Sequence, residues 1–357
     1  MSREIRQRPA TIIDVAQAAG ISISTVSRAY HSPDLVRAGT RARALAAAAE
    51  LGYTPNRAAR GLTTGRTGSL GLVVPDIANP FFPALIKAAQ RRAHAGDHAL
   101  YLADGEEDPH TEFRAIQMMA KQVDAVVACS SRMSPAQLRA AASLVPLVLI
   151  NRSFEHLPAV LLDMGGGMRQ AVEHLHALGH RRCIYLAGPA NSWSGRQRHR
   201  AFRQACTRLG IESVELGPFD PTYEVGASAA DLALAVGTTA IIAFNDLMAL
   251  GVLARLGERG LRVPEEISVV GFDDIRMAEM ASPPLTTVAA PAAEAGRAAI
   301  ELALDPLAAR NHGGRRAHTL LTRLRIRASS GPAPAMKRGL HQPQAPHAGA
   351  AATIGAA

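Results

Sequence analysis

The stretch TIIDVAQAAGISISTVSRAY, residues 11–30, has the pattern of two short helices joined by a tight turn. Thr11 followed by Asp14 is the spacing of a helix start at which side chains satisfy free backbone N–H groups. Gly20 stands where the chain must turn sharply, and glycine accepts positive φ. Ser22 is placed to cap a second helix. The stretch therefore predicts a helix-turn-helix.

In this motif the second helix lies in the major groove of DNA, and its N-terminal side chains reach base edges. The side chains expected on the inner faces are Val15, Ala16, Ala19 and Val26. Those expected to point outward from the second helix are Ile23, Ser24, Thr25, Ser27 and Arg28. A small amphipathic hairpin without a DNA role would look similar, but the spacing and the basic surroundings favour DNA contact.

Positive charge is concentrated near the start of the chain. The 357 residues carry a net charge of +9, and residues 1–66 hold 10 Arg against 4 acidic residues. Two-thirds of the excess positive charge therefore lies in under a fifth of the chain. A basic N-terminal unit on a near-neutral body is the electrostatic footprint of phosphate binding.

The remaining composition indicates a cytoplasmic protein without a metal or cofactor. Cys129, Cys183 and Cys206 are too few and too scattered for a disulfide framework or a zinc site, so buried thiols are expected. Residues 1–9, MSREIRQRP, lack the apolar segment of a secretory signal. No apolar run approaches the length that crosses a bilayer, so no membrane partner is expected.

From residue 69 onward, short apolar runs alternate with amphipathic stretches. The expected strands are residues 70–74, 98–103, 124–129, 146–150, 182–188, 239–244 and 268–272. The expected helices are residues 81–95, 111–122, 167–178, 196–209, 224–236 and 247–259. Repeated β-α alternation predicts parallel sheets covered by helices on both faces. The number of strands favours two doubly wound lobes over one.

These patterns divide the chain into four parts. The predicted parts are a helix-turn-helix domain over 1–52 with a third helix at 40–51, a hinge helix and linker over 53–66, a two-lobed core over 67–330, and a disordered tail over 331–357. The tail is rich in Ala, Pro, His and Gly and has no hydrophobic periodicity.

Polar side chains follow most of the apolar runs in the core. Ligands of parallel α/β sheets bind beyond the carboxyl ends of the strands, so these side chains are candidates for a binding site. They are Asp76, Asn79, Asp104, Ser130, Asn151, Asn245, Asp246, Asp273 and Asp274. Some are expected to cap helices, Asp246 in particular. The set suits a polyhydroxylated ligand, on which Phe81, Phe82 or Trp193 could stack.

Several blocks of sequence, taken in their order along the chain, resemble the lactose-repressor/galactose-repressor (LacI/GalR) family of transcriptional regulators. The matching blocks run from residue 11 to about residue 328 and include AELGYTPNRAARGL, PDIANPFF, AGPANSWSGRQRHRAF, AFNDLMALG and ISVVGFDD. The resemblance implies an N-terminal helix-turn-helix headpiece, a hinge helix, and an α/β two-lobed, periplasmic-binding-protein-like core with parallel sheets. It also implies a homodimer that represses transcription from a near-palindromic double-stranded DNA operator under the control of a small-molecule effector, a sugar or related metabolite.

The resemblance assigns DNA contacts by matching position. Ile23, Ser24 and Arg28 match base-reading positions, while Thr25 and Ser27 match positions that contact the DNA backbone. The full predicted DNA-binding set is Thr11, Ile23, Ser24, Thr25, Ser27, Arg28, Asn56, Ala59 and Leu62.

In the hinge, Thr54 is placed to cap a short helix and Pro55 suits its first turn. Leu62 matches a leucine that wedges into the central base step, an insertion that unstacks bases and bends DNA. Gly61 weakens the hinge helix by about 1 kcal/mol relative to Ala, so this hinge should depend more on DNA to fold. A solvated linker is the alternative for residues 53–66.

In the core, the resemblance implies that Arg198, Asn245 and Asp273 hold hydroxyl groups of the effector. Phe82 matches a stacking position, and Asn151 matches a polar position at the hinge side of the cleft.

The sequence departs from the family pattern at His31, which replaces a usual Asn, and at Arg37, which replaces a common capping Ser. The tail lacks a leucine heptad, so a dimer is expected rather than a tetramer.

Other functions find less support. Among His174, His176 and His180, the last two are four residues apart, but no third ligand stands at recognisable metal-ligand spacing, so surface or packing histidines are expected. Gly165–Gly167 precedes a helix but has no phosphate-loop motif after it, so a turn between lobes is expected. The chain shows no nucleophile, base and acid arrangement typical of an enzyme. A sugar-binding protein without a DNA role is the serious alternative, but it would need a signal peptide and no headpiece.

Overall fold

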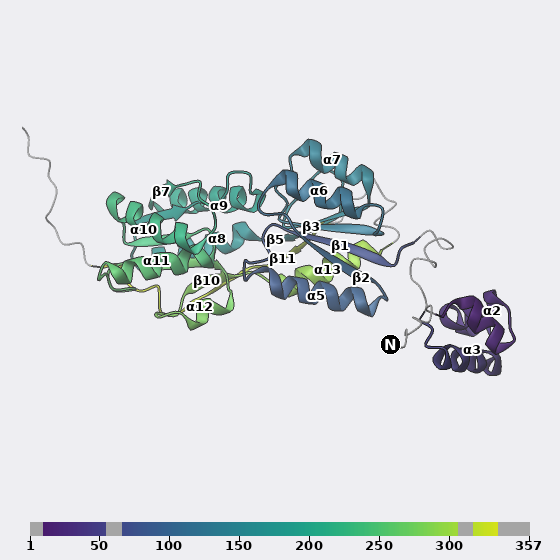
Figure 1. Ribbon diagram of the computed structural model, residues 1–357. Helices are drawn as coiled ribbons and strands as arrows, with labels where there is room; N and C mark the ends of the chain where they lie inside the picture. The colour runs from purple at the N-terminus through teal and green to yellow at the C-terminus, as the bar shows by residue number, and fades with distance from the viewer. Residues whose placement is uncertain (1–9, 55–65, 306–316, 335–357) are drawn as a thin grey trace, which may run out of the picture. The chain divides into compact units, whose positions relative to one another are not determined.

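The computed structural model describes residues 10–54, 66–305 and 317–334. The chain forms two compact units (Figure 1). One contains the headpiece, residues 10–54, and the other contains almost all of the two-lobed core. Among the helices described, none combines the length and apolarity needed to cross a membrane.

The headpiece is the predicted helix-turn-helix. Helix α1 (Ile12–Ala19) begins with a capping box, in which the Thr11 backbone N–H donates to Asp14 Oδ2 at 2.8 Å and the Asp14 N–H donates to Thr11 Oγ1 at 3.4 Å. Gly20 ends it with φ +64°, and Ser22 caps α2 (Ile23–His31). These features confirm the turn and both caps.

A third helix, α3 (Ala38–Glu50), packs against the first two. It begins two residues before the predicted start, and Arg37 at its N-cap makes no side-chain cap hydrogen bond. The headpiece core is small and built mainly of Ala and Val side chains. Its buried members are Val15, Ala16, Ala19, Val26, Ala47 and Ala48.

The N-terminal lobe is a six-stranded sheet in the order β11-β5-β4-β3-β1-β2. Its strands are β1 (Ser69–Val74), β2 (Ala99–Asp104), β3 (Ala125–Cys129), β4 (Leu147–Ile150), β5 (Ala159–Leu162) and β11 (Ala317–Leu320). The central strands β1, β3 and β4 are parallel and buried, as expected when helices cover both faces. The helices are α5 (Phe82–Ala95) and α13 (Ala292–Leu304) on one face, with α6 (Pro109–Met119) and α7 (Pro135–Leu144) on the other (Figure 1).

The C-terminal lobe repeats this plan in the order β12-β10-β9-β8-β6-β7. Its strands are β6 (Arg182–Leu186), β7 (Glu212–Leu216), β8 (Ala240–Ala243), β9 (Ser268–Asp273), β10 (Thr286–Ala289) and β12 (Arg323–Arg325). All neighbours are parallel except β12, which runs antiparallel to β10. Its helices are α8 (Met164–Ala177), α9 (Trp193–Leu209), α10 (Tyr223–Val236), α11 (Asp246–Glu258) and α12 (Arg276–Met280).

The described chain crosses between the lobes after β5, after β10 and after β11. The first and last crossings are bonded to each other. The Asp163 backbone N–H donates to the Leu320 carbonyl at 2.9 Å, and Thr322 Oγ1 donates to the Asp163 carbonyl at 2.7 Å. The two lobes therefore share a hydrogen-bonded hinge.

Several elements differ from expectation. The elements that the apolar runs did not predict are strands β5, β7, β10, β11 and β12 and helices α7, α12 and α13. Gly165–Gly167 lies in the first turn of α8 rather than in a turn between lobes, because Asp163 caps the helix there. The tail prediction is wrong at its start, since Gly331 is buried and its N–H donates to Ser268 Oγ at 3.0 Å. The rest of that tail, residues 335–357, lies outside the described residues.

Candidate functional site

The exposed face of α2 carries the side chains predicted to read DNA. Ile23 is 47% exposed, Ser24 and Arg28 are exposed, and Thr25 and Ser27 are half-buried. Val26 and Ala29, on the opposite face, are buried. Exposed isoleucine and arginine side chains on this helix are suited to contact thymine methyl groups and guanine acceptors.

Hydroxyl groups organise the start of this helix. Ser22 Oγ lies 2.9 Å from Ser24 Oγ and 2.8 Å from Thr25 Oγ1. Thr11 is half-buried at the N-terminus of α1. The other three predicted DNA-binding residues, Asn56, Ala59 and Leu62, lie outside the described residues, as does most of the predicted hinge.

In the core, one cavity between the lobes is lined by all five residues predicted to bind the effector. These are Phe82, Asn151, Arg198, Asn245 and Asp273. The carboxyl ends of parallel strands meet at one edge of a sheet, and the two lobes turn these edges toward each other, which brings the residues together. The remaining lining residues are Asn79, Phe81, Glu107, Ser130, Arg132, Met164, Ser194, Pro221 and Phe244.

Arg198 is the central cation of this cavity. Its guanidinium carbon lies 4.6 Å from the ring centre of Phe244 and 3.9 Å from that of Phe272, so two aromatic faces hold it flat. Nη1 donates to the Phe244 carbonyl, and Nη2 lies 3.6 Å from Asp273 Oδ1. The buried Nε has no partner among the described atoms. Arg198 therefore offers a fixed donor to a ligand.

Asp273 is the central anion. Its side chain is only 9% exposed, and this burial raises the pKa of the carboxyl to about 7, while the Arg198 charge opposes that rise. Burial also raises the pKa of Asp246 well above its usual range, with the neighbouring Asp273 charge acting in the same direction. Two buried carboxyl groups thus share one nearby guanidinium, and protonated forms are favoured.

Three polar residues of the cavity have strained backbone conformations. Ser130, Asn151 and Asp273 have φ values of +46°, +56° and +119°. Asn151 Nδ2 donates to Ser130 Oγ at 3.4 Å, and the buried Asn151 Oδ1 has no partner among the described atoms. Strain and unpaired buried acceptors both cost stability and collect at ligand sites.

Asn245 has a structural task that was not predicted. Its Oδ1 accepts from the Met248 N–H at 2.9 Å and caps α11, while Nδ2 donates to the Pro221 carbonyl at 3.0 Å. The prediction that Asp246 is the cap is wrong. Asp246 is the first residue of α11, and its carboxylate accepts instead from the Ile275 N–H and the Thr287 hydroxyl.

Not all of the other candidates reach the cavity. Trp193 lines a different hollow with Arg169 and Arg200. Asp76 and Asp104 accept hydrogen bonds from nearby backbone N–H groups, and Asp274 pairs with Arg327 at 2.7 Å. Polar residues at strand ends therefore divide between ligand-facing and structural roles.

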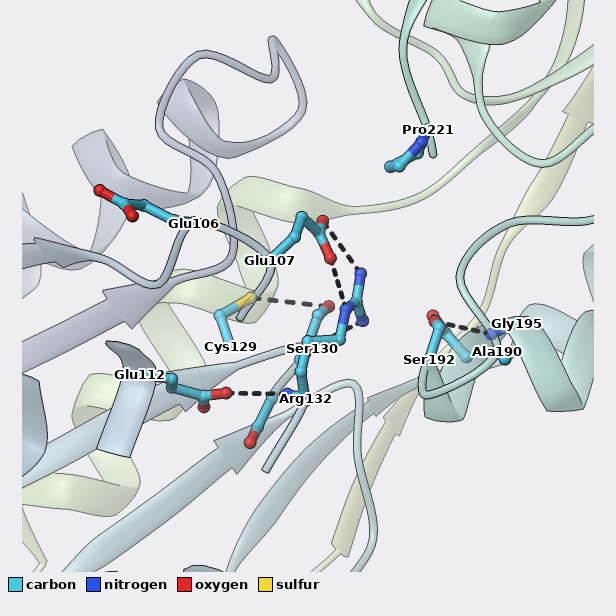
Figure 2. A network of polar contacts seen from close by, with 12 residues as sticks. Glu106, Glu107, Glu112, Cys129, Ser130, Arg132, Ala190, Ser192, Gly195 and Pro221 are labelled. Atoms are coloured by element: carbon cyan, nitrogen blue, oxygen red, sulfur yellow. Dashed lines mark hydrogen bonds and ion pairs between the residues drawn. The ribbon is translucent and has the colours of Figure 1, made fainter. Parts of the chain in front are cut away.

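The cavity residues that sequence reasoning missed include Glu107 and Arg132. Figure 2 shows the Arg132 guanidinium facing the Glu107 carboxylate, with Nε at 2.5 Å and Nη2 at 3.1 Å from its oxygens. The Arg132 backbone N–H donates to Glu112 at 2.8 Å. Arg132 and Glu107 each lie three residues beyond the end of a strand, β3 and β2, so a rule that selects only the residues directly at strand ends misses both.

The cavity is narrow, with a volume of about 30 Å³. This is room for about two water molecules, so a sugar requires the lobes to separate or the side chains to rearrange.

His174 and His180, considered as metal ligands, and the three cysteines have structural roles in the core. His180 is buried and lies 2.8 Å from Thr239 Oγ1 and 3.1 Å from Ser268 Oγ, while His174 Nε2 lies 2.9 Å from Ser330 Oγ. The three cysteines are buried free thiols, and burial raises their pKa to about 12.

Known protein families match parts of both units of the chain. Residues 11–56 match the bacterial regulatory proteins of the lacI family, and residues 172–330 match a periplasmic binding protein-like domain. The chain is 34% identical to the HTH-type transcriptional regulator DegA of Bacillus subtilis over 80% of this chain and 88% of the relative. It is 33% identical to the HTH-type transcriptional repressor CytR of Escherichia coli over 88% of this chain and 94% of the relative.

Among solved structures, the chain is similar to the lac repressor dimer bound to operator and the anti-inducer ONPF, with 28% identity and a TM-score of 0.82. That match covers 91% of this chain and 100% of the other. The similar proteins are regulators of transcription rather than enzymes. Together with the helix-turn-helix and the two parallel-sheet lobes, this places the chain in the lacI family of bacterial regulatory proteins.

Proposed function

We propose that the protein is a cytoplasmic transcriptional repressor that binds a palindromic double-stranded DNA operator as a homodimer and responds to a sugar or related small metabolite. The observation that carries the proposal is the convergence of Phe82, Asn151, Arg198, Asn245 and Asp273 on one interlobe cavity, in a chain whose α2 presents an exposed reading face.

On α2, Arg28 is suited to donate two hydrogen bonds to the O6 and N7 atoms of a guanine, and Ile23 to contact a thymine methyl group. Ser24 lies beside them and can donate or accept. Thr11 at the start of α1, with Thr25 and Ser27, would contact the DNA backbone and set the register of the headpiece.

A homodimer is supported by exposed apolar side chains in the core. Tyr101 and Leu102 on the edge strand β2 are 49% and 46% exposed, and Met280 on α12 is 73% exposed. The similar lac repressor structure is a dimer bound to operator. A two-fold symmetric protein matches a two-fold symmetric DNA site, because each headpiece meets the same half-site.

The cavity chemistry supports a polyhydroxylated effector. Arg198 offers a fixed donor, Asp273 accepts from hydroxyl groups when ionised, and the unpaired Asn151 Oδ1 accepts as well. Phe82, 5% exposed, offers an apolar face. Similar solved structures include a CelR–cellobiose complex, at 32% identity and a TM-score of 0.66, and a regulator from Enterococcus faecium with bound ribose, at 26% identity and a TM-score of 0.67.

A sugar-binding protein without a DNA role is less well supported. It would not account for the headpiece, with its capped α1, its glycine turn and the exposed face of α2.

The test begins with selection of binding sites from random double-stranded DNA by the full-length protein. We expect a two-fold symmetric sequence. Arg28→Ala should bind that sequence at least tenfold more weakly, since a good side-chain contact to a base edge contributes about 1–3 kcal/mol. Arg139→Ala, which removes an exposed arginine from the core, is the matched control. No enriched sequence, or equal binding by Arg28→Ala, would overturn the operator proposal.

The same operator complex tests the effector. Neutral sugars are screened for a change in operator affinity, measured by fluorescence anisotropy. Asn151→Ala should require at least tenfold more of an active sugar, whereas the Arg139→Ala control should respond as the unaltered protein does. Equal responses would remove Asn151 from the effector site. Trp193 fluorescence is a poor readout because that ring lies outside the cavity.

A further inference from the structure

A second cavity lies beside the first and shares a wall with it. Its volume is about 780 Å³, and Arg132 lines both cavities. The other lining residues come from both lobes and are Pro109, His110, Phe113, Met133, Ser134, Pro135, Gln137, Arg152, Asn191 and Arg196. The two cavities therefore meet at Arg132.

The ionisable lining of the second cavity is basic. It contains Arg132, Arg152, Arg196 and His110, and none of the described residues that line it is acidic. The three arginines come from three different segments and both lobes. Like charges held together cost stability unless an anion offsets them.

The three arginines differ in how many N–H donors they leave free for a bound anion. Arg132 is neutralised by Glu107, as Figure 2 shows. Arg152 is only 6% exposed, and its described hydrogen bond runs from Nη1 to the Ser131 carbonyl at 2.6 Å. Arg196 is exposed, and its described hydrogen bond runs from Nη1 to the Ala190 carbonyl at 3.3 Å. A guanidinium has five N–H donors, so both keep donors to spare.

Burial and the neighbouring positive charges both disfavour the charged form of Arg152. Burial lowers the pKa of Arg152, the Glu112 carboxylate raises it, and the positive charges of Arg196 and Arg132 lower it again. Arg196 on α9 is thus close enough to repel Arg152, although the two belong to different lobes.

Two helix N-termini add to the positive potential. Pro109 and His110 are the first residues of α6, and Pro135 is the first of α7, with Ser134 as its cap. The N-terminus of a helix carries a partial positive charge that favours anions. These ends reinforce the arginines but would not define a site without them.

We propose that Arg152 and Arg196 form an anion subsite that binds a phosphate group carried by the effector, whose polyhydroxylated part lies in the interlobe cavity. The inference rests on the proposed function of that cavity and narrows its ligand to phosphorylated sugars or similar polyols. Planar guanidinium groups bind phosphate oxygens in pairs, and one from each lobe lets a single phosphate bridge the lobes.

The first experiment uses inorganic phosphate as the probe and the full-length protein. The phosphate concentration that gives a half-maximal rise in Tm is measured at constant ionic strength, balanced with sodium chloride. Arg196→Met should raise that concentration at least tenfold. Arg196 is exposed, so the variant should fold, and Arg139→Met is the control for loss of an exposed arginine. Arg152→Lys, which keeps the charge but loses the fork, should give a smaller loss.

Equal phosphate dependence in Arg196→Met and the unaltered protein would overturn the subsite. Operator binding without phosphate is measured in parallel, so a failure of the regulator proposal is distinguished from a failure of the subsite.

The second experiment separates a phosphate carried by the effector from a free anion. Hexose and pentose monophosphates are compared with inorganic phosphate as competitors and as ligands. If at least one sugar phosphate binds tenfold more tightly than inorganic phosphate, and loses that advantage in Arg196→Met, the phosphate belongs to the effector. If every sugar phosphate binds only as tightly as inorganic phosphate, the effector-borne assignment is overturned.

Discussion

At the scale of single residues, the interlobe cavity concentrates side chains that are costly to bury. Asp273 and Asp246 hold carboxyl groups whose pKa burial raises, and Arg198 keeps an unpaired Nε. Asn151 keeps an unpaired Oδ1. None of these features strengthens the core, so a ligand that pairs with them would stabilise the protein by more than its own contact area indicates.

Asp273 should make stability depend on pH. Its folded pKa is about 7, raised by burial, whereas an unfolded Asp titrates near 4. Between these values the folded protein holds a proton that the unfolded chain has released, so the free energy of unfolding should fall as pH rises from 5 toward 7 and then level off. The slope is at most about 1.4 kcal/mol per pH unit for one group.

Urea unfolding of the full-length protein at pH 5 and pH 8 checks this prediction. Asp273→Asn keeps a neutral side chain at every pH and should lose less stability over that interval. The Asp273 charge also raises the pKa of Asp246, so the difference between the two proteins reports Asp273 together with its effect on Asp246. Identical losses in the two proteins would show that Asp273 is ionised in the folded state throughout.

At the scale of elements, the pair α10 and α11 depends on close backbone approach. A Cβ added at Gly251 would meet the Tyr223 carbonyl oxygen at 2.0 Å, whereas one added at Gly257, on the same helix, would meet nothing within 4 Å. Gly251→Ala should therefore lower the free energy of unfolding by about 1–3 kcal/mol through overpacking. Gly257→Ala should leave it unchanged or raise it by up to about 1 kcal/mol, because alanine favours helix.

Urea midpoints of the two variants test the packing, with the urea dependence of the unfolding free energy checked for constancy. Similar destabilisation by both substitutions would mean that loss of glycine itself, and not the contact between helices, is responsible.

The elements that could be predicted from sequence are those with strong local signals. The capping box at Thr11, the turn at Gly20 and the fully buried strands β1, β3 and β8 leave a clear pattern in the chain. Strand β7 does not, since it lies at a sheet edge and none of its residues is buried. Helix α7 could have been found, because Ser134 and Gln137 have the spacing of the capping box that they form.

The residues that line the cavity were only partly predictable, because the sequence signal marks the ends of strands and not the direction of each side chain. Polar residues directly after strands, such as Ser130, Asn151 and Asp273, reach the cavity as expected. The same rule also selected Asp76 and Asp104, which bind nearby backbone instead. It missed Glu107, whose place depends on the loop after β2. The rule identifies an edge of the sheet, whereas the rotation of each loop decides which side chains face a ligand.

At the scale of the whole molecule, the two units should unfold separately. The headpiece has a small core of Ala and Val side chains, and the other unit holds the large cores of both lobes. Small cores bury less of their chain's surface and are less stable. Calorimetry should show a first transition of about 30 kcal/mol, from about 0.7 kcal/mol per residue over the 45 residues 10–54, followed by a larger one.

Operator DNA should raise the temperature of the first transition before it changes the second, because a ligand stabilises the unit that it binds. The matched control is DNA of the same length and scrambled sequence. A single transition that moves as a whole on adding operator would contradict independent units.

The hinge between the lobes has a mechanical consequence. The described chain crosses between the lobes three times, and the crossings after β5 and β11 are joined by the hydrogen bonds of Asp163 with Leu320 and Thr322. Strands joined side by side resist sliding past one another, since sliding would break those bonds, but they bend together at little cost. These bonds therefore favour bending of the lobes about the hinge over sliding of one lobe past the other. Any ligand that fills the cavity, from a small sugar to a larger anion, should therefore act on the headpieces through one quantity, the angle between the two lobes.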